Sequence, residues 1–95
     1  MEKEDRFMNL LNSCPIMEEY FYMEYGVVDV KRLKKDFKFK SPGEQIMLAF
    51  LKVIWDPDGS WFKAIDNFPI LQQLRRLDQE NEKLIANWVA RPFYM

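Results

Sequence analysis

The chain has 95 residues, of which 48% are hydrophobic, 16% aromatic and 31% charged, and its formal net charge is −1. This length and composition predict one domain, residues 1–95, with a packed core, and they argue against disorder. Histidine is absent, which excludes any mechanism that needs an imidazole base, a histidine metal ligand or a histidine pH switch.

The single cysteine, Cys14, excludes an internal disulfide framework and suits a reducing compartment. The first residues, MEKEDRF, are acidic and polar, and they are typical neither of a secretory signal nor of a transit peptide. We therefore predict a cytoplasmic protein. The net charge near zero gives no global attraction to nucleic acid or to a membrane surface.

Two short helices are predicted before Gly26. Residues 4–13 place apolar side chains on one face at helical spacing, and Pro15 ends this pattern because the residue before a proline avoids the helical region. Residues 16–25 form a second helical pattern, with Gly26 as its C-cap. The aromatic run 20–22 also favours a strand, so both structures stay open there. The apolar face of the first helix consists of Phe7, Leu10, Leu11 and Cys14.

A third helix is predicted from Asp29 as N-cap through Phe37 (DVKRLKKDF). Val30, Leu33 and Phe37 lie at spacings of three and four and form its apolar face, while the opposite face is basic. From Phe37 the pattern becomes Phe-Lys-Phe-Lys, an alternation typical of extended backbone. We therefore expect a short extended link over residues 37–40.

The strongest helix signal lies at residues 41–55 (SPGEQIMLAFLKVIW). Ser41 suits the N-cap, Pro42 suits the first helical position, and Glu44 stands where a capping box needs it. Nine of the last ten residues are apolar, which predicts a helix buried on nearly all sides, with Lys52 marking the only side that meets water. The segment is shorter than the roughly 20 apolar residues of a membrane span.

Residues 56–60 (DPDGS) predict a turn after this central helix, since proline sets φ and glycine tolerates a positive φ. Short helical turns are expected over residues 61–68 and 70–77, with Pro69 between them. Both segments carry apolar side chains at helical spacing, so each is predicted to cover part of the central helix.

Asp78 is predicted to cap a last helix, residues 79–90, whose first turn is acidic and therefore complements the helix dipole. Pro92 ends this helix and leaves an aromatic tail. The chain as a whole predicts an all-α domain of five or six short helices around residues 41–55. The buried stripe predicted for the last helix consists of Leu84, Ile85, Trp88 and Val89.

Residues 31–40 hold six basic residues against one acid, Asp36, with Phe37 and Phe39 between them. Basic and aromatic side chains together can neutralise phosphates and stack on bases. The solvated face of an amphipathic helix, with both phenylalanines in the core, explains the same pattern. The candidate nucleic-acid-binding residues are Lys31, Arg32, Lys34, Lys35, Lys38 and Lys40.

Other motifs indicate no chemistry. Residues 56–59 (DPDG) resemble part of a calcium loop, but Ile54 and Ile65 stand where its first and twelfth ligands belong. Cys14 has no histidine to activate it, so a buried, inert thiol is expected. Pairs of carboxylates elsewhere fit solvated faces and helix caps. We predict no catalytic residue, no metal site and no cofactor.

The three tryptophans, four tyrosines and eight phenylalanines exceed what a core of this size readily hides. Aromatic side chains are enriched at protein interfaces. The aromatic tail either belongs to such an interface or folds back onto the central helix, and the sequence leaves both open. The candidate partner-binding residues are Tyr20, Tyr22, Tyr25, Phe93 and Tyr94.

A spaced pattern runs through the C-terminal half: Ser41-x-Gly43-Glu44-x-x-Met47-x-x-Phe50, then Trp55, Leu77-Asp78, Trp88 and Pro92-Phe93. With a looser match over residues 5–25, it resembles a group of short, uncharacterised bacterial proteins. The resemblance implies a small intracellular bacterial protein and leaves a mobile element open as its source. It implies no activity and no site residues.

These observations predict a non-enzymatic interaction or regulatory module that binds a protein partner or forms a homodimer. The alternative is a nucleic-acid-binding module that uses residues 31–40. No membrane partner is expected.

Overall fold

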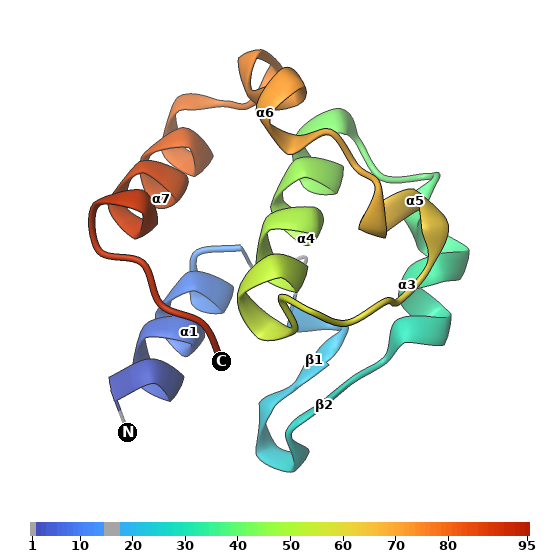
Figure 1. Ribbon diagram of the computed structural model, residues 1–95, viewed down its shortest axis with the longest axis horizontal. Helices are drawn as coiled ribbons and strands as arrows, with labels where there is room; N and C mark the ends of the chain where they lie inside the picture. Colours follow the sequence, from blue (N-terminus) through green and yellow to red (C-terminus); the bar gives the residue numbers. More distant parts are fainter. Residues whose placement is uncertain (1, 15–17) are drawn as a thin grey trace. The chain divides into compact units, whose positions relative to one another are not determined.

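The computed structural model describes residues 2–14 and 18–95, and these ranges are mostly helical, as the sequence predicts (Figure 1). The chain divides into two compact units, Met1–Phe39 and Lys40–Met95. A single domain over residues 1–95 stays a prediction. The first unit contains α1 (Glu2–Asn12), β1 (Phe21–Tyr22), the 3₁₀ turn η1 (Met23–Tyr25), β2 (Val27–Val28) and α3 (Val30–Phe37). The second contains α4 (Pro42–Trp55), α5 (Lys63–Asp66), α6 (Ile70–Gln73), the 3₁₀ turn η2 (Leu74–Arg76) and α7 (Gln79–Ala90).

A small β-hairpin lies between α1 and α3 in the chain. β1 and β2 pair antiparallel, with Phe21 opposite Val28 and Tyr22 opposite Val27. The helix predicted for residues 16–25 is therefore wrong from β1 onward, and the strand that the sequence left open for residues 20–22 forms at Phe21 and Tyr22. The reason is that the aromatic pair finds a β-branched partner strand within reach of a tight turn. Residues 15–17, which include the start of the predicted helix, lie outside the described ranges.

Gly26 makes the hairpin turn, and it caps η1 in place of the longer helix for which a cap was predicted. Its φ is 64°, in the left-handed region that glycine adopts without steric cost. Its N–H donates to the Met23 carbonyl at 3.2 Å. A side chain at this position would be strained by the backbone conformation alone.

In the described part of the first unit, α1 and α3 each bury one apolar face. Phe7 and Leu11 of α1 are buried, as are Leu33 and Phe37 of α3. Phe7 meets the hairpin at Phe21, with ring centroids 5.6 Å apart and an edge-on geometry. Both apolar faces match the predicted helical spacing. The buried position predicted for Cys14 is also confirmed.

The extended link predicted for residues 37–40 is wrong, because the chain turns there. Lys38 has helical dihedrals, with φ −65° and ψ −19°. The Phe39 N–H donates to the Asp36 carbonyl at 2.9 Å. Phe37 is buried, whereas Phe39 is 79% exposed. The Phe-Lys-Phe-Lys alternation therefore does not come from an extended strand, because its two phenylalanines lie on opposite sides of a turn.

The second unit is built on α4, and the cap predicted for this helix is confirmed. Ser41 Oγ accepts the Glu44 N–H at 3.3 Å, and the Glu44 carboxylate accepts the Ser41 N–H at 2.9 Å. Pro42 occupies the first helical position. The backbone N–H group of Ser41 holds the pKa of the Glu44 carboxyl below its usual value. The buried residues of α4 are Ile46, Met47, Leu48, Ala49, Phe50, Leu51, Lys52 and Ile54.

Lys52 does not mark a solvent-facing side of α4, so that prediction is wrong. Its ammonium group donates to the Gly59 carbonyl and lies 3.4 Å from Asp66 Oδ1. The turn after α4 folds back over this side of the helix and satisfies the charge there. A buried ammonium group requires such partners.

The turn predicted for residues 56–60 forms, but the positive φ expected of its glycine is wrong: Gly59 has no positive φ, and it is needed because the space beside its Cα is occupied. A Cβ at Gly59 would overlap the Asp56 carboxylate. That carboxylate accepts the Trp61 indole N–H at 3.0 Å. The Asp56 carboxylate is therefore used as a hydrogen-bond acceptor inside the turn, which agrees with the prediction that residues 56–60 form a turn.

α5, α6 and η2 pack on α4, and α7 follows after the predicted Asp78 cap, whose carboxylate accepts the Asn81 N–H at 3.3 Å. The prediction of a buried α7 stripe is wrong, since no residue of α7 is buried. Trp88 is half-buried and Val89 is 62% exposed. α7 therefore keeps part of its apolar surface uncovered.

The C-terminal tail returns to α4, one of the two arrangements that the sequence left open. The Met95 N–H donates to the Ile54 carbonyl at 2.8 Å. The Trp88 indole N–H donates to the Phe93 carbonyl at 3.0 Å, and the Phe93 side chain is buried. The tail is thus part of the core of the second unit.

Candidate interaction surfaces

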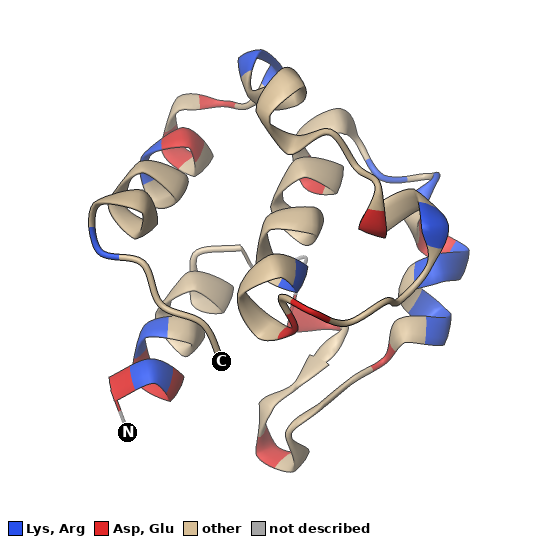
Figure 2. Ribbon diagram, viewed as in Figure 1, with Lys and Arg blue, Asp and Glu red and all other residues tan. Residues whose placement is uncertain are grey.

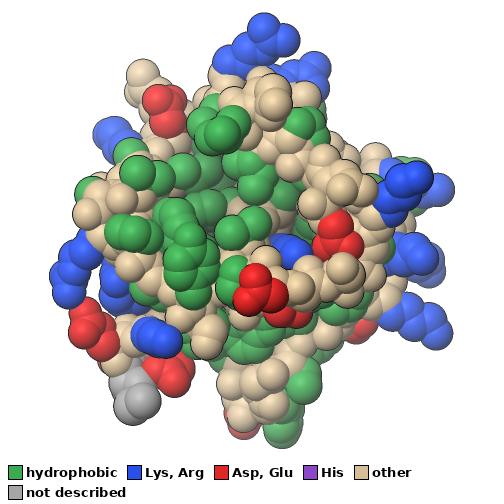
Figure 3. All heavy atoms as spheres, in the orientation of Figure 1, with side chains coloured by type: hydrophobic (Ala, Val, Ile, Leu, Met, Phe, Trp, Pro, Cys, Tyr) green, Lys and Arg blue, Asp and Glu red, His purple; other side chains and the backbone are tan. Residues whose placement is uncertain are grey.

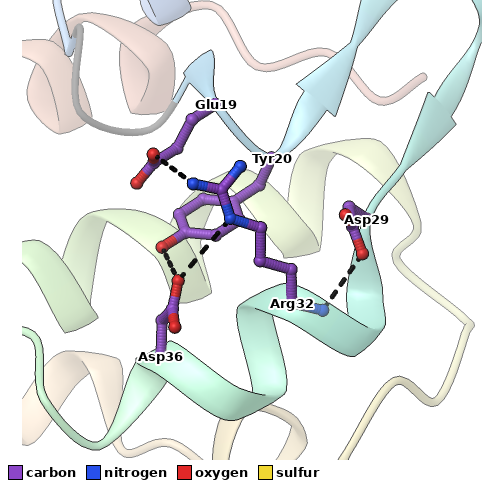
Figure 4. A network of polar contacts seen from close by, with 5 residues as sticks. All are labelled: Glu19, Tyr20, Asp29, Arg32 and Asp36. Atoms are coloured by element: carbon purple, nitrogen blue, oxygen red, sulfur yellow. Dashed lines mark hydrogen bonds and ion pairs between the residues drawn. The ribbon is translucent and has the colours of Figure 1, made fainter.

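A polar network ties the chain before the hairpin to α3 (Figure 4). The Tyr20 hydroxyl donates to Asp36 Oδ2 at 2.8 Å. Arg32 Nη2 donates to Glu19 Oε2 at 2.9 Å, and Arg32 Nε lies 3.9 Å from Asp36 Oδ2. The Arg32 guanidinium also lies 5.5 Å from the centre of the Tyr20 ring. Asp29 caps the helix beneath by accepting the Arg32 N–H at 3.0 Å.

Tyr20 is therefore a core residue and not part of an exposed surface, which corrects its place among the predicted partner-binding residues. Its side chain is fully buried. Burial and the hydrogen bond to Asp36 raise the pKa of its phenol above the usual value. Tyr20 stands next to Phe21 and Tyr22 in the sequence, so the sequence alone does not show which of the three side chains is buried on a polar partner. The contacts with α3 decide this.

The exposed tyrosines lie on the hairpin. Tyr25 is 74% exposed, and Tyr22 is also exposed, with Met8 of α1 and Val27 of β2. Met8, Tyr22 and Tyr25 are among the residues that line a shallow hollow of about 290 Å³. Tyr22 and Tyr25 are thus exposed to solvent, and their role in binding a partner stays a prediction.

Of the two tail residues, only Tyr94 is exposed. Its ring packs edge-on against Trp88, with centroids 5.5 Å apart, and Trp88 packs in the same way on Phe50. Phe93 is buried, so its truncation would test the core of the second unit and not an interface.

The basic residues of segment 31–40 do not act as one group. Arg32 belongs to the polar network, and Lys40 is half-buried and lies in the second unit. The four remaining lysines are exposed at positions i, i+3, i+4 and i+7, so they share one side of α3 and its last turn (Figure 2). We call them the basic face: Lys31, Lys34, Lys35 and Lys38.

An apolar groove in the second unit is the surface that sequence reasoning missed. It has a volume of about 480 Å³ and lies between α7 and the segment formed by η2 and Leu77. Figure 3 shows hydrophobic side chains gathered over these elements. The only available signal was the i, i+3, i+4, i+7 spacing in α7, which is equally typical of a buried stripe. The groove is lined by Leu74, Arg75, Leu77, Glu82, Ile85, Ala86 and Val89.

Among residues 2–14 and 18–95, no group of three or more cysteine, aspartate or glutamate side chains is arranged to hold a metal ion. No helix within the same ranges is long and apolar enough to cross a membrane. The acidic Asp78 serves as a cap, and its hydrogen bonds with Asn81 lower the pKa of its carboxyl.

Comparisons with known proteins add no family assignment. No protein-family model matches the chain, and neither a curated protein nor a solved structure matches it. The resemblance to short bacterial proteins therefore stays a prediction.

Proposed function

We propose that the protein acts by binding and not by catalysis, as an interaction module that pairs with a second copy of itself through the α7 groove. The observation that carries this proposal is the uncovered apolar lining of the groove. Val89 lies open to solvent on one wall, and Leu71, in the chain leading to the other wall, is 80% exposed. Contiguous apolar surface of this kind marks interaction sites, because covering it releases water.

The groove presents a stripe suited to helix packing. Glu82, Ile85, Ala86 and Val89 follow one another at i, i+3, i+4 and i+7 along α7. This spacing places them on one face of the helix. Recognition of a helix by an apolar groove uses the same spacing of contacts. The α7 stripe of a second copy therefore has the right form to fill the groove.

The charges beside the groove support a second copy as the partner. One wall carries Arg75 and the other carries Glu82. In a two-fold interface every contact occurs twice, so each Arg75 can meet the Glu82 of the partner copy. The net charge of −1 causes little repulsion between copies. A self-complementary surface results from these two charges and the apolar lining between them.

Size-exclusion chromatography with light scattering tests the proposal. We expect a dimer in the micromolar range. Val89→Lys should shift the protein to monomer, because it places a charge in the apolar interface. Val27→Lys is the matched control, since Val27 is also exposed but lies in the hairpin, and it should leave the dimer intact. A clean monomer at all micromolar concentrations would contradict the proposal.

A charge exchange tests the two-fold arrangement itself. Arg75→Glu alone should weaken the dimer, because two glutamates would then face each other. The double variant Arg75→Glu with Glu82→Arg should restore it. If the double variant dimerises no better than the single one, these residues do not pair across the interface, and the proposed geometry is wrong.

A further inference from the structure

The basic face of α3 is a second surface, and no carboxylate of the described residues pairs with its lysines. Figure 2 shows these basic residues together along one helix. We propose that this face, with the neighbouring Phe39, binds single-stranded nucleic acid. This site is separate from the α7 groove and lies within the first unit.

The polar network explains why the lysines are left unpaired. Asp36 is the only acid in residues 31–40, and it accepts the Tyr20 hydroxyl and faces Arg32. Glu19, the other nearby carboxylate, is held by Arg32 at 2.9 Å (Figure 4). Both acids are thereby directed away from neutralising the basic face. The local charge remains positive although the whole chain is nearly neutral.

Phe39 adds an aromatic platform at the end of this face. It is 79% exposed, and the Lys38 ammonium group lies 5.1 Å from the centre of its ring. Most of the Phe39 ring is therefore open to a ligand. A flat ring beside lysines is the arrangement on which bases stack while the backbone phosphates meet positive charge.

Other anionic partners fit this surface less well. The apolar side of α3, with Leu33 and Phe37, is buried, so the helix has no free apolar face to insert into a membrane. The bases of a duplex are stacked on each other and cannot stack on a side chain. An acidic protein would pair its carboxylates with the lysines, and this charge pairing does not involve the exposed Phe39 ring. A single strand uses the lysines and the ring together.

Fluorescence anisotropy with a fluorescein-labelled oligothymidylate, at low salt and then with rising sodium chloride, tests the site. We expect the oligothymidylate to bind. A plot of the logarithm of its association constant against the logarithm of the salt concentration should fall with a slope of about −0.7 for each phosphate contacted. Lys34→Gln with Lys35→Gln should weaken binding and flatten this slope by about 1.4. The matched control, Lys63→Gln with Lys83→Gln, removes two exposed lysines of the second unit and should leave affinity and slope unchanged.

Phe39→Ala separates nucleic-acid binding from general attraction of anions. Loss of one stacked base should weaken binding between about fivefold and about 150-fold, the equivalent of about 1–3 kcal/mol. Because Phe39 is exposed, circular dichroism should show an unchanged fold. The oligothymidylate should also bind more tightly than the same sequence in a duplex.

Three results would overturn the proposal. The first is no binding of the oligothymidylate at low salt. The second is an equal loss of affinity in the control variant. The third is equal binding of polyglutamate or of anionic lipid vesicles together with no effect of Phe39→Ala, since the face would then attract polyanions without recognising bases.

Discussion

Phe50 links α4 to α7 and the tail, and its truncation tests this part of the core. The side chain is 5% exposed, and Trp88 packs edge-on against it at 5.5 Å. Phe50→Ala should lower the free energy of unfolding by about 3–5 kcal/mol, the usual cost of a buried aromatic truncation. Of this, about 0.5–1.5 kcal/mol belongs to the aromatic pair beyond its buried area.

Urea unfolding followed by circular dichroism measures this loss. Because the whole stability of a domain is about 5–15 kcal/mol, Phe50→Ala could unfold the protein, and Phe50→Leu provides a milder variant. It keeps most of the apolar volume but loses the edge-on contact, so a cost of about 1–2 kcal/mol is expected. Lys63→Ala is the control at an exposed position away from the groove, with an expected change within about 0.5 kcal/mol. A cost below about 1 kcal/mol for Phe50→Ala would refute this account of the core.

Three further predictions concern local contacts of the second unit. Gly59→Ala should cost about 1–3 kcal/mol in urea unfolding, because its Cβ overlaps the Asp56 carboxylate; an unchanged midpoint would show that the turn relaxes freely. Lys52→Met should cost about 1–3 kcal/mol, since it removes the donor to the Gly59 carbonyl and the positive charge beside Asp66, whereas Lys63→Met, at an exposed position, should cost nothing measurable. The lowered pKa of Glu44 means that its cap stabilises the fold fully above the unfolded-state pKa of about 4.3 and loses this contribution as the pH falls through the lower folded value. The stability difference between wild type and Glu44→Ala should therefore shrink in acid, and a constant difference from pH 7 to pH 2 would contradict the assigned cause.

The predictions from the sequence succeeded where the deciding contact lies within a few residues. The Ser41–Glu44 capping box and the Asp29 and Asp78 caps each join a side chain to a backbone group three residues away. Such contacts form in any context that permits the helix. The helices that follow these caps were therefore predicted with nearly correct starts.

The predictions failed where a residue's role depends on distant partners. Tyr20 and Tyr22 are neighbours of the same type, yet one is buried on Asp36 and the other is exposed. The pairing of β1 with β2 similarly overrode a helical pattern. The charge of Lys52 predicted exposure, but the carbonyl of Gly59 and the carboxylate of Asp66 make its burial tolerable.

The sequence by itself determined a mostly helical protein, its principal helix caps and the amphipathic character of α3, because these follow from local spacing and backbone chemistry. Only the tertiary structure decided which surfaces remain free. The apolar groove exists because α7 packs without burying its whole stripe, and the basic face is unpaired because Tyr20 and Arg32 hold the nearby acids. Both depend on contacts between residues far apart in the chain, which spacing along the sequence does not encode.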